Sequence, residues 1–132
     1  MPGNPSMLRQ RVSAGIALLA GAAGASAVLL GAFGAHALRN LLDAQQHELW
    51  RTAVEYHLGH ALALVLAAGL GRGRSGRAAV AAFALGIVLF SGSLYALALG
   101  APRPVGVLTP IGGVAFVCGW IALGLSMRGR GD

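Results

Sequence analysis

The chain has 132 residues, of which 56% are hydrophobic and 11% are charged, whereas a soluble domain carries roughly 25% charged residues. This composition excludes an ordinary soluble globule. The net charge of +6 comes from ten arginines scattered between apolar stretches, so the chain lacks the clustered basic face that nucleic-acid binding requires. We therefore expect the lipid bilayer as its surroundings and no nucleic-acid partner.

Four apolar stretches, residues 12–38, 56–71, 78–102 and 104–127, contain no Asp, Glu, Lys or Arg. A helix needs about 20 such residues to cross a bilayer. The sequence predicts an all-α integral membrane four-helix bundle that forms a single membrane domain over residues 1–132. Its spans are expected at 13–38, 52–71, 78–100 and 105–127.

The first span carries small residues at helical spacing, namely Ala20, Gly24, Ala27, Gly31 and Gly34. The third span repeats this pattern with Ala82, Gly86 and Ser93, and the fourth with Gly112, Gly113 and Gly119. Small residues let membrane helices approach closely, either inside the bundle or against a partner, and both uses stay open. The first span also resembles a secretory signal, but apolar sequence continues beyond its small-residue sites, which favours a retained span.

The second helix is expected to begin before the membrane, because Asp43 and Gln46 have the spacing of a capping box. From Ala44 to Gly71 it would be about 42 Å long, which exceeds a bilayer core of roughly 30 Å. Its first two turns should therefore lie at the wet surface, with Trp50 at the interface. We favour an ordinary solvated helix start there over a recognition site.

Residues 72–77 are rich in Gly and Arg and are expected to form a tight basic turn without structure of its own. Counting arginines predicts the orientation, because cationic short loops stay in the cytoplasm. Seven lie on the side of the termini and three lie opposite: Arg9, Arg11, Arg72, Arg74, Arg77, Arg128 and Arg130 against Arg39, Arg51 and Arg103. We expect both termini to be cytoplasmic, in a multi-pass protein of the bacterial plasma (inner) membrane.

Polar side chains from every span fall in the outer half of the predicted membrane region, where they are costly and therefore informative. Those with ligand-binding potential are His36, His60, Ser91, Ser93, Tyr95 and Thr109. His57 and His60 share one helix face and are weak candidates for a metal or haem pair, but that face offers no carboxylate. We predict no metal site and no cofactor, and expect hydrogen bonds between helices to be the main role of these imidazoles.

The fourth span begins with Thr109 and Pro110, followed by Gly112 and Gly113. This segment could be a broken helix that lines a site, but proline in a first helical turn is ordinary, and we favour the latter. The sequence contains no Ser-His-Asp arrangement, phosphate-binding loop or dinucleotide fingerprint. We therefore predict no catalytic residues, and an enzyme is not the favoured class.

Four blocks of sequence resemble domain of unknown function 423 and cover nearly the whole chain. They are residues 31–36 (GAFGAH), 52–56 (TAVEY) with 60–63 (HALA), 89–95 (LFSGSLY), and 109–113 (TPIGG) with 119–120 (GW). The resemblance implies a small bacterial inner-membrane protein, similar also to the animal transmembrane protein 256, without an established activity. His57 and Gly59 depart from the family pattern, which typically has Gln and a bulky residue there, so the resemblance gives His57 no role as a ligand.

Taken together, these features predict an accessory or assembly component of a membrane complex, with a membrane-protein partner or a homo-oligomeric state. The alternative prediction is a binder or carrier of a small amphipathic ligand, a quinone or a lipid, held in the outer polar layer.

Overall fold

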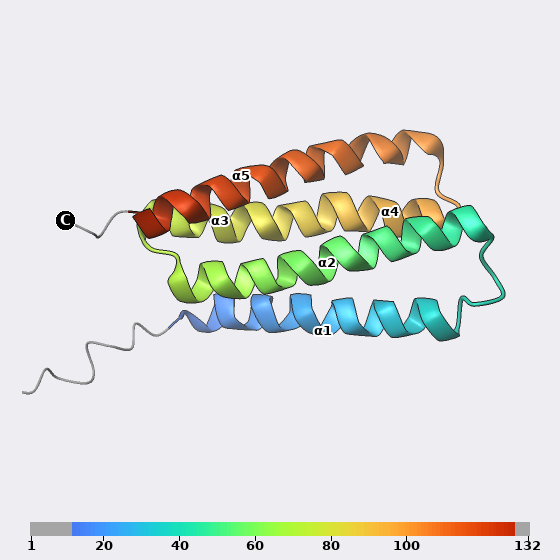
Figure 1. Ribbon diagram of the computed structural model, residues 1–132, viewed down its shortest axis with the longest axis horizontal. Coiled ribbons are helices and arrows are strands. Elements are labelled where there is room, and N and C mark those ends of the chain that lie inside the picture. The colour runs from blue at the N-terminus through green and yellow to red at the C-terminus, as the bar shows by residue number, and fades with distance from the viewer. Residues whose placement is uncertain (1–11, 129–132) are drawn as a thin grey trace, which may run out of the picture.

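The computed structural model describes residues 12–128; Arg9, Arg11 and Arg130 of the orientation argument lie outside them. Four long helical rods lie side by side (Figure 1). The first two rods are α1 (Ala14–His36) and α2 (Ala44–Leu70). The third joins α3 (Gly73–Gly86), a π-helical turn η2 (Ile87–Ser91) and α4 (Gly92–Ala98), and the fourth joins a 3₁₀ turn η3 (Arg103–Val107) to α5 (Leu108–Arg128). The predicted all-α membrane bundle is confirmed.

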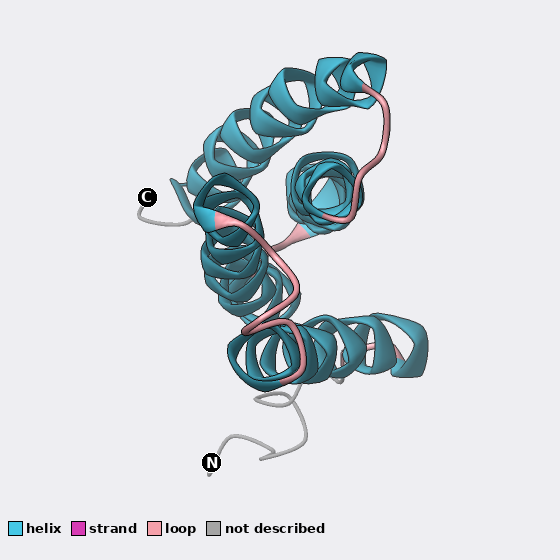
Figure 2. Ribbon diagram, turned by 90° about the vertical axis from the view of Figure 1, so that its right-hand side faces the viewer, coloured by secondary structure: helices cyan, strands magenta, loops and turns pink. Residues whose placement is uncertain are grey.

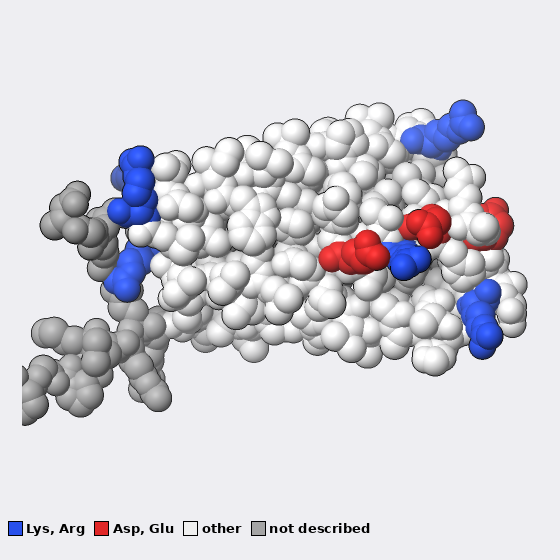
Figure 3. All heavy atoms as spheres, viewed as in Figure 1, with Lys and Arg blue, Asp and Glu red and all other residues white. Residues whose placement is uncertain are grey.

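The outer surface of the bundle is apolar, as a membrane requires. Large hydrophobic side chains are exposed on all four rods, including Leu29 at 69%, Leu62 at 60% and Val88 at 67%. On the face shown in Figure 3, one group of charged side chains lies at one end of the bundle, a second group extends from the other end to near the middle, and an uncharged band separates them. We call the end that holds residues 37–43 and 99–107 the loop end, and the opposite end, where α1 begins and α5 ends, the terminal end.

The start of α2 follows the predicted capping box. The Gln46 backbone N–H donates to the Asp43 carboxylate at 2.8 Å, and the Asp43 backbone N–H donates to Gln46 Oε1 at 2.9 Å. This reciprocal pair satisfies two backbone groups that a helix start would otherwise leave without partners. The helix therefore begins at Ala44, as predicted.

The tight turn predicted for residues 72–77 is wrong, because α3 already begins at Gly73. Gly71 and Gly76 lie in close backbone contact, which no side chain would permit, and Gly73 adopts a φ of 62°, a region that favours glycine. Ser126 of α5 holds this corner: its hydroxyl donates to the Arg72 carbonyl at 3.0 Å and accepts from the Arg72 backbone N–H at 2.5 Å. The basic residues thus form the first turns of a helix.

The third and fourth rods interlock through phenylalanines that fill glycine sites. Phe116 of α5 packs on Gly86, and Phe83 of α3 packs on Gly119; a Cβ at either glycine would overlap the opposing ring. Phe83 is fully buried and Phe116 is 3% exposed. Close packing of this kind holds membrane helices together, since apolar surface gains nothing by leaving lipid. The small faces predicted for these two spans are therefore used inside the bundle.

The first rod lies at the edge of the bundle. Figure 2 shows α1 beside α2 and away from the rod that ends in α5, and its packing within the described residues is almost entirely against α2. Trp50 covers Gly34 and Val54 contacts Gly31, while Ala20 and Ala27 are buried. The predicted small face of α1 therefore meets α2, and among residues 12–128 no helix packs against the opposite face of α1.

Candidate functional site

The polar layer predicted from the sequence is divided into separate hydrogen-bonded groups that connect helices. Ser26, His57 and Tyr95 form one group. The others centre on Ser91, on Ser93 with Thr109, and on His60.

His57 lies in the interior, 4% exposed, and connects three helices. Its Nδ1 lies 2.9 Å from the Tyr95 hydroxyl on α4, and its Nε2 lies 3.1 Å from Ser26 Oγ on α1. The Ser26 hydroxyl already donates to the Ala23 carbonyl at 3.0 Å, so it accepts from His57 Nε2–H. This leaves Nδ1 to accept from Tyr95, because a neutral imidazole has one donor and one acceptor. The neutral ring therefore uses both nitrogens within the protein.

Three hydroxyls tie the third rod to its neighbours. Ser91 is fully buried in the π-turn and donates to the Ala53 carbonyl of α2 at 2.7 Å. Ser93 donates to the Phe90 carbonyl at 2.8 Å, so at 2.5 Å it accepts from Thr109 at the start of α5. Pro110 lies in the first turn of α5, which continues without interruption through Gly112 and Gly113, as the favoured interpretation of this segment predicts.

His60 belongs to an aromatic cluster between α2 and α5. Its Nδ1–H donates to the Tyr56 carbonyl at 2.8 Å, and its Nε2 accepts from the Trp120 indole N–H at 3.1 Å. The imidazole stacks on Phe116 with ring centroids 3.6 Å apart. A carbonyl only accepts and an indole N–H only donates, so the neutral tautomer is fixed and both nitrogens are occupied.

The remaining predicted residue, His36, is exposed at the end of α1 and does not join these groups. His57 and His60 share a helix but bond to different neighbours, α1 and α4 for His57 and α5 for His60. Among the described residues, no group of three or more His, Cys, Asp or Glu side chains could hold a metal ion. Every buried side-chain nitrogen or oxygen in this part of the chain has a hydrogen-bond partner.

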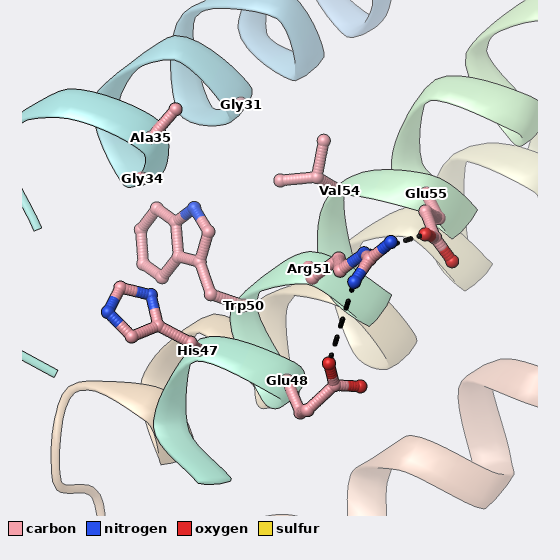
Figure 4. A pocket seen from close by; sticks show the side chains of 9 residues that line it. All are labelled: Gly31, Gly34, Ala35, His47, Glu48, Trp50, Arg51, Val54 and Glu55. Carbon is pink, nitrogen blue, oxygen red and sulfur yellow. Dashed lines mark ion pairs between the residues drawn. The ribbon is translucent and has the colours of Figure 1, made fainter. Parts of the chain in front are cut away.

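A cleft at the loop end of α1 and α2 was not predicted as a site. We call it the Trp50 cleft; its volume is about 340 Å³, and its lining is Gly31, Gly34, Ala35, His47, Glu48, Trp50, Arg51, Val54 and Glu55. Figure 4 shows the small α1 residues on one side, the indole beneath and the charged side chains along α2. Arg51 lies 3.7 Å from Glu48 and 3.4 Å from Glu55, and the Trp50 indole N–H donates to the Leu30 carbonyl at 2.9 Å.

The sequence did contain a signal for this cleft. Glu48, Arg51 and Glu55 are spaced three and four residues apart, which places them on one helix face. Glu55 also falls inside the span predicted at 52–71, where an exposed carboxylate is unusual. The predicted solvated helix start covers only the first two turns of α2, and Glu55 lies beyond them.

Comparison with known proteins places this architecture in a family. The family described as "Protein of unknown function (DUF423)" matches residues 30–113, which include most of the residues that form the polar groups and the whole Trp50 cleft. The chain belongs to the DUF423 family. The resemblance noted from its four sequence blocks is thereby confirmed.

Relatives of this DUF423 protein are named as membrane proteins. UPF0382 membrane protein YwdK of Bacillus subtilis is 46% identical over 102 residues, which cover 74% of this chain and 82% of the relative. A UPF0382 membrane protein of Haemophilus influenzae is 42% identical over 98 residues, covering 73% and 79%. UPF0382 inner membrane protein YgdD of Escherichia coli is 42% identical over 99 residues, covering 70% and 73%.

No solved structure matches the chain. The named relatives and the four helices long enough to cross a bilayer confirm the predicted location, a multi-pass protein of the bacterial plasma (inner) membrane.

Proposed function

We propose that this DUF423 protein is a non-catalytic accessory or assembly component of a membrane complex. The observation that carries the proposal is the outward face of the first half of α1, where Ala17, Gly21 and Ala25 are exposed at spacings of four residues. A Cβ at Gly21 would meet nothing within 4 Å. Small residues at this spacing suit the close approach of another transmembrane helix, which we take to belong to a different membrane protein.

The bonding of the polar layer supports this proposal over a carrier. Carriers and enzymes keep polar groups free to meet a ligand, whereas His57, His60, Ser91 and Ser93 bond to neighbouring helices. The alternative, an amphipathic ligand held by His36, His60, Ser91, Ser93, Tyr95 and Thr109, remains a prediction. A rigid core with one uncovered helix is better suited to holding a partner than to loading and releasing a small molecule.

Photo-crosslinking tests the proposal in native membranes. A photoreactive amino acid at Ala25 should cross-link to a second, different membrane protein, while the same group at Val114, exposed at 63% on α5, should not. Gly21→Leu should abolish the cross-link because its side chain blocks close approach. Gly59→Leu is the matched control, since a Cβ at exposed Gly59 of α2 also meets nothing within 4 Å.

Two results would overturn the proposal. Cross-linking of Ala25 only to a second copy of the chain would make the protein a homo-oligomer. Equal cross-linking yields in the Gly21→Leu and Gly59→Leu variants would show that the contact does not depend on the small-residue face of α1.

A further inference from the structure

The Trp50 cleft lies where the headgroup region of a bilayer meets its hydrocarbon core. If the core begins at Leu70, the terminal end of α2, a core of roughly 30 Å ends about 20 residues away, near Trp50 and Arg51. Indole rings prefer this interface, and Trp50 forms the floor of the cleft. The cleft is therefore accessible to lipids of the leaflet at the loop end.

Glu55 then lies about 6 Å inside the hydrocarbon core at a rise of 1.5 Å per residue, yet its side chain is 64% exposed. Charged side chains at such depth normally face the protein interior or a partner. Arg51 forms an ion pair with Glu55, but it also forms one with Glu48. Two carboxylates and one guanidinium leave one negative charge, so the group attracts a further cation.

The surface beneath the charged group is apolar and continues along the same face of α2. Leu58, Leu62 and Leu66 follow Glu55 at spacings of three and four residues and are 41%, 60% and 45% exposed. The charged group and this apolar strip together offer contacts for the headgroup and for one acyl chain of a phospholipid.

We propose that the Trp50 cleft binds the headgroup of an amine-bearing zwitterionic phospholipid of the phosphatidylethanolamine class. The lipid phosphate accepts charge-assisted hydrogen bonds from Arg51, and the ethanolamine arm lies along α2, so that its ammonium donates to the neighbouring Glu55. Glu48, nearly two turns closer to the end of the helix, stays in contact with water. One acyl chain runs over Leu58 and Leu62.

The geometry favours a lipid over a protein helix in this cleft. The volume of about 340 Å³ falls in the range of roughly 300–1,000 Å³ that small-molecule sites occupy. Below it the cleft closes, because Val54 contacts Gly31 and Ala27 is buried against α2. A transmembrane helix would require a groove along much of the rod, whereas a headgroup requires only the loop end.

The same chemistry predicts which lipids are preferred. A phosphatidylcholine headgroup has no N–H to donate, so its hydrogen bonds to Glu55 are lost. A phosphatidylglycerol headgroup carries a net negative charge toward two carboxylates and is repelled. The expected order of retention is phosphatidylethanolamine, then phosphatidylcholine, then phosphatidylglycerol.

Native mass spectrometry of the purified protein, with these three lipids added at matched acyl chains, tests the proposal. We expect one phosphatidylethanolamine per protein, with retention about tenfold weaker in Glu55→Gln and in Arg51→Gln, as the loss of a charge-assisted hydrogen bond implies. Arg103→Gln is the matched control, because Arg103 is exposed at the same end of the bundle and does not line the cleft. It should retain the lipid as the wild type does.

A second readout uses the position of Trp50. In a Trp120→Phe background only one tryptophan remains, and phosphatidylethanolamine brominated near its headgroup should quench it more strongly than the brominated choline lipid. Equal retention of all three lipids by the wild-type protein would overturn the proposal without any variant. Unchanged retention in Glu55→Gln would also overturn it, as would a protein dimer that depends on Glu55 and excludes the lipid.

Discussion

Gly112→Ala tests the closest approach between the third and fourth rods. A Cβ at Gly112 would overlap the backbone N and Cα of Phe90 in the π-turn, as well as its Cβ. Backbone atoms cannot rotate away as the end of a flexible side chain can, so α5 must move from η2. That movement would disturb the Ser93–Thr109 hydrogen bond at 2.5 Å nearby.

Overpacking of this kind destabilises by about 1–3 kcal/mol. Gly113→Ala is a control one residue away, where a Cβ would meet only the Phe90 ring, at 3.8 and 4.0 Å. That contact is ordinary, and alanine is a better helix former than glycine by up to about 1 kcal/mol. Gly112→Ala should therefore lower the free energy of unfolding, whereas Gly113→Ala should raise it or leave it unchanged.

The assay is reversible unfolding in mixed micelles as the fraction of sodium dodecyl sulfate is raised, followed by helical ellipticity. The predicted result is an earlier midpoint for Gly112→Ala and a wild-type or later midpoint for Gly113→Ala. Equal destabilisation by the two substitutions would refute the close contact between α5 and the π-turn.

Two further predictions concern the His57 group and the orientation. Tyr95→Phe leaves buried His57 Nδ1 without its donor and should lower the free energy of unfolding by about 1–3 kcal/mol. Tyr56→Phe is the control, because Tyr56 is 44% exposed, and it should lower the free energy of unfolding by less than about 0.5 kcal/mol. Equal losses in the two variants would contradict the hydrogen bond between His57 and Tyr95. In a variant lacking the native cysteine, a membrane-impermeant thiol reagent added outside should label Ala44→Cys and not Ser75→Cys, and labelling of Ser75→Cys would invert the orientation.

The sequence was sufficient to predict the helices that depend on local patterns. Apolar length located the four rods, because a bilayer imposes that length on any spanning helix. The capping box of Asp43 and Gln46 acts within four residues and was equally visible. Small residues at spacings of three and four predicted which faces of α1 and α5 approach another helix, although spacing alone does not identify the opposing residue.

Other features depend on contacts between distant residues and could not be predicted in this way. The glycine sites filled by Phe83 and Phe116 require the relative height of two rods. The early start of α3 depends on the contact of Gly71 with Gly76 and on Ser126, which lies 54 residues away from Arg72.

For the candidate site, the sequence predicted that polar residues would gather in a layer and favoured hydrogen bonds between helices. It could not assign the partners of His57 and His60, which lie on α1, α4 and α5. The Trp50 cleft combines a small face of α1 with charges of α2, and each half was noted separately. Joining them required the packing of α1 on α2, which brings Gly31 and Gly34 opposite Val54 and Trp50.

A role in a larger membrane assembly is tested most directly by the native size of the tagged protein, extracted from its own membrane in a mild detergent, with mass spectrometry of everything that co-migrates. We expect it to migrate with a stoichiometric, different membrane protein, and this co-migration to be lost in Gly21→Leu and kept in Gly59→Leu. Migration of the wild-type protein alone, as a monomer or a small homo-oligomer, would contradict it.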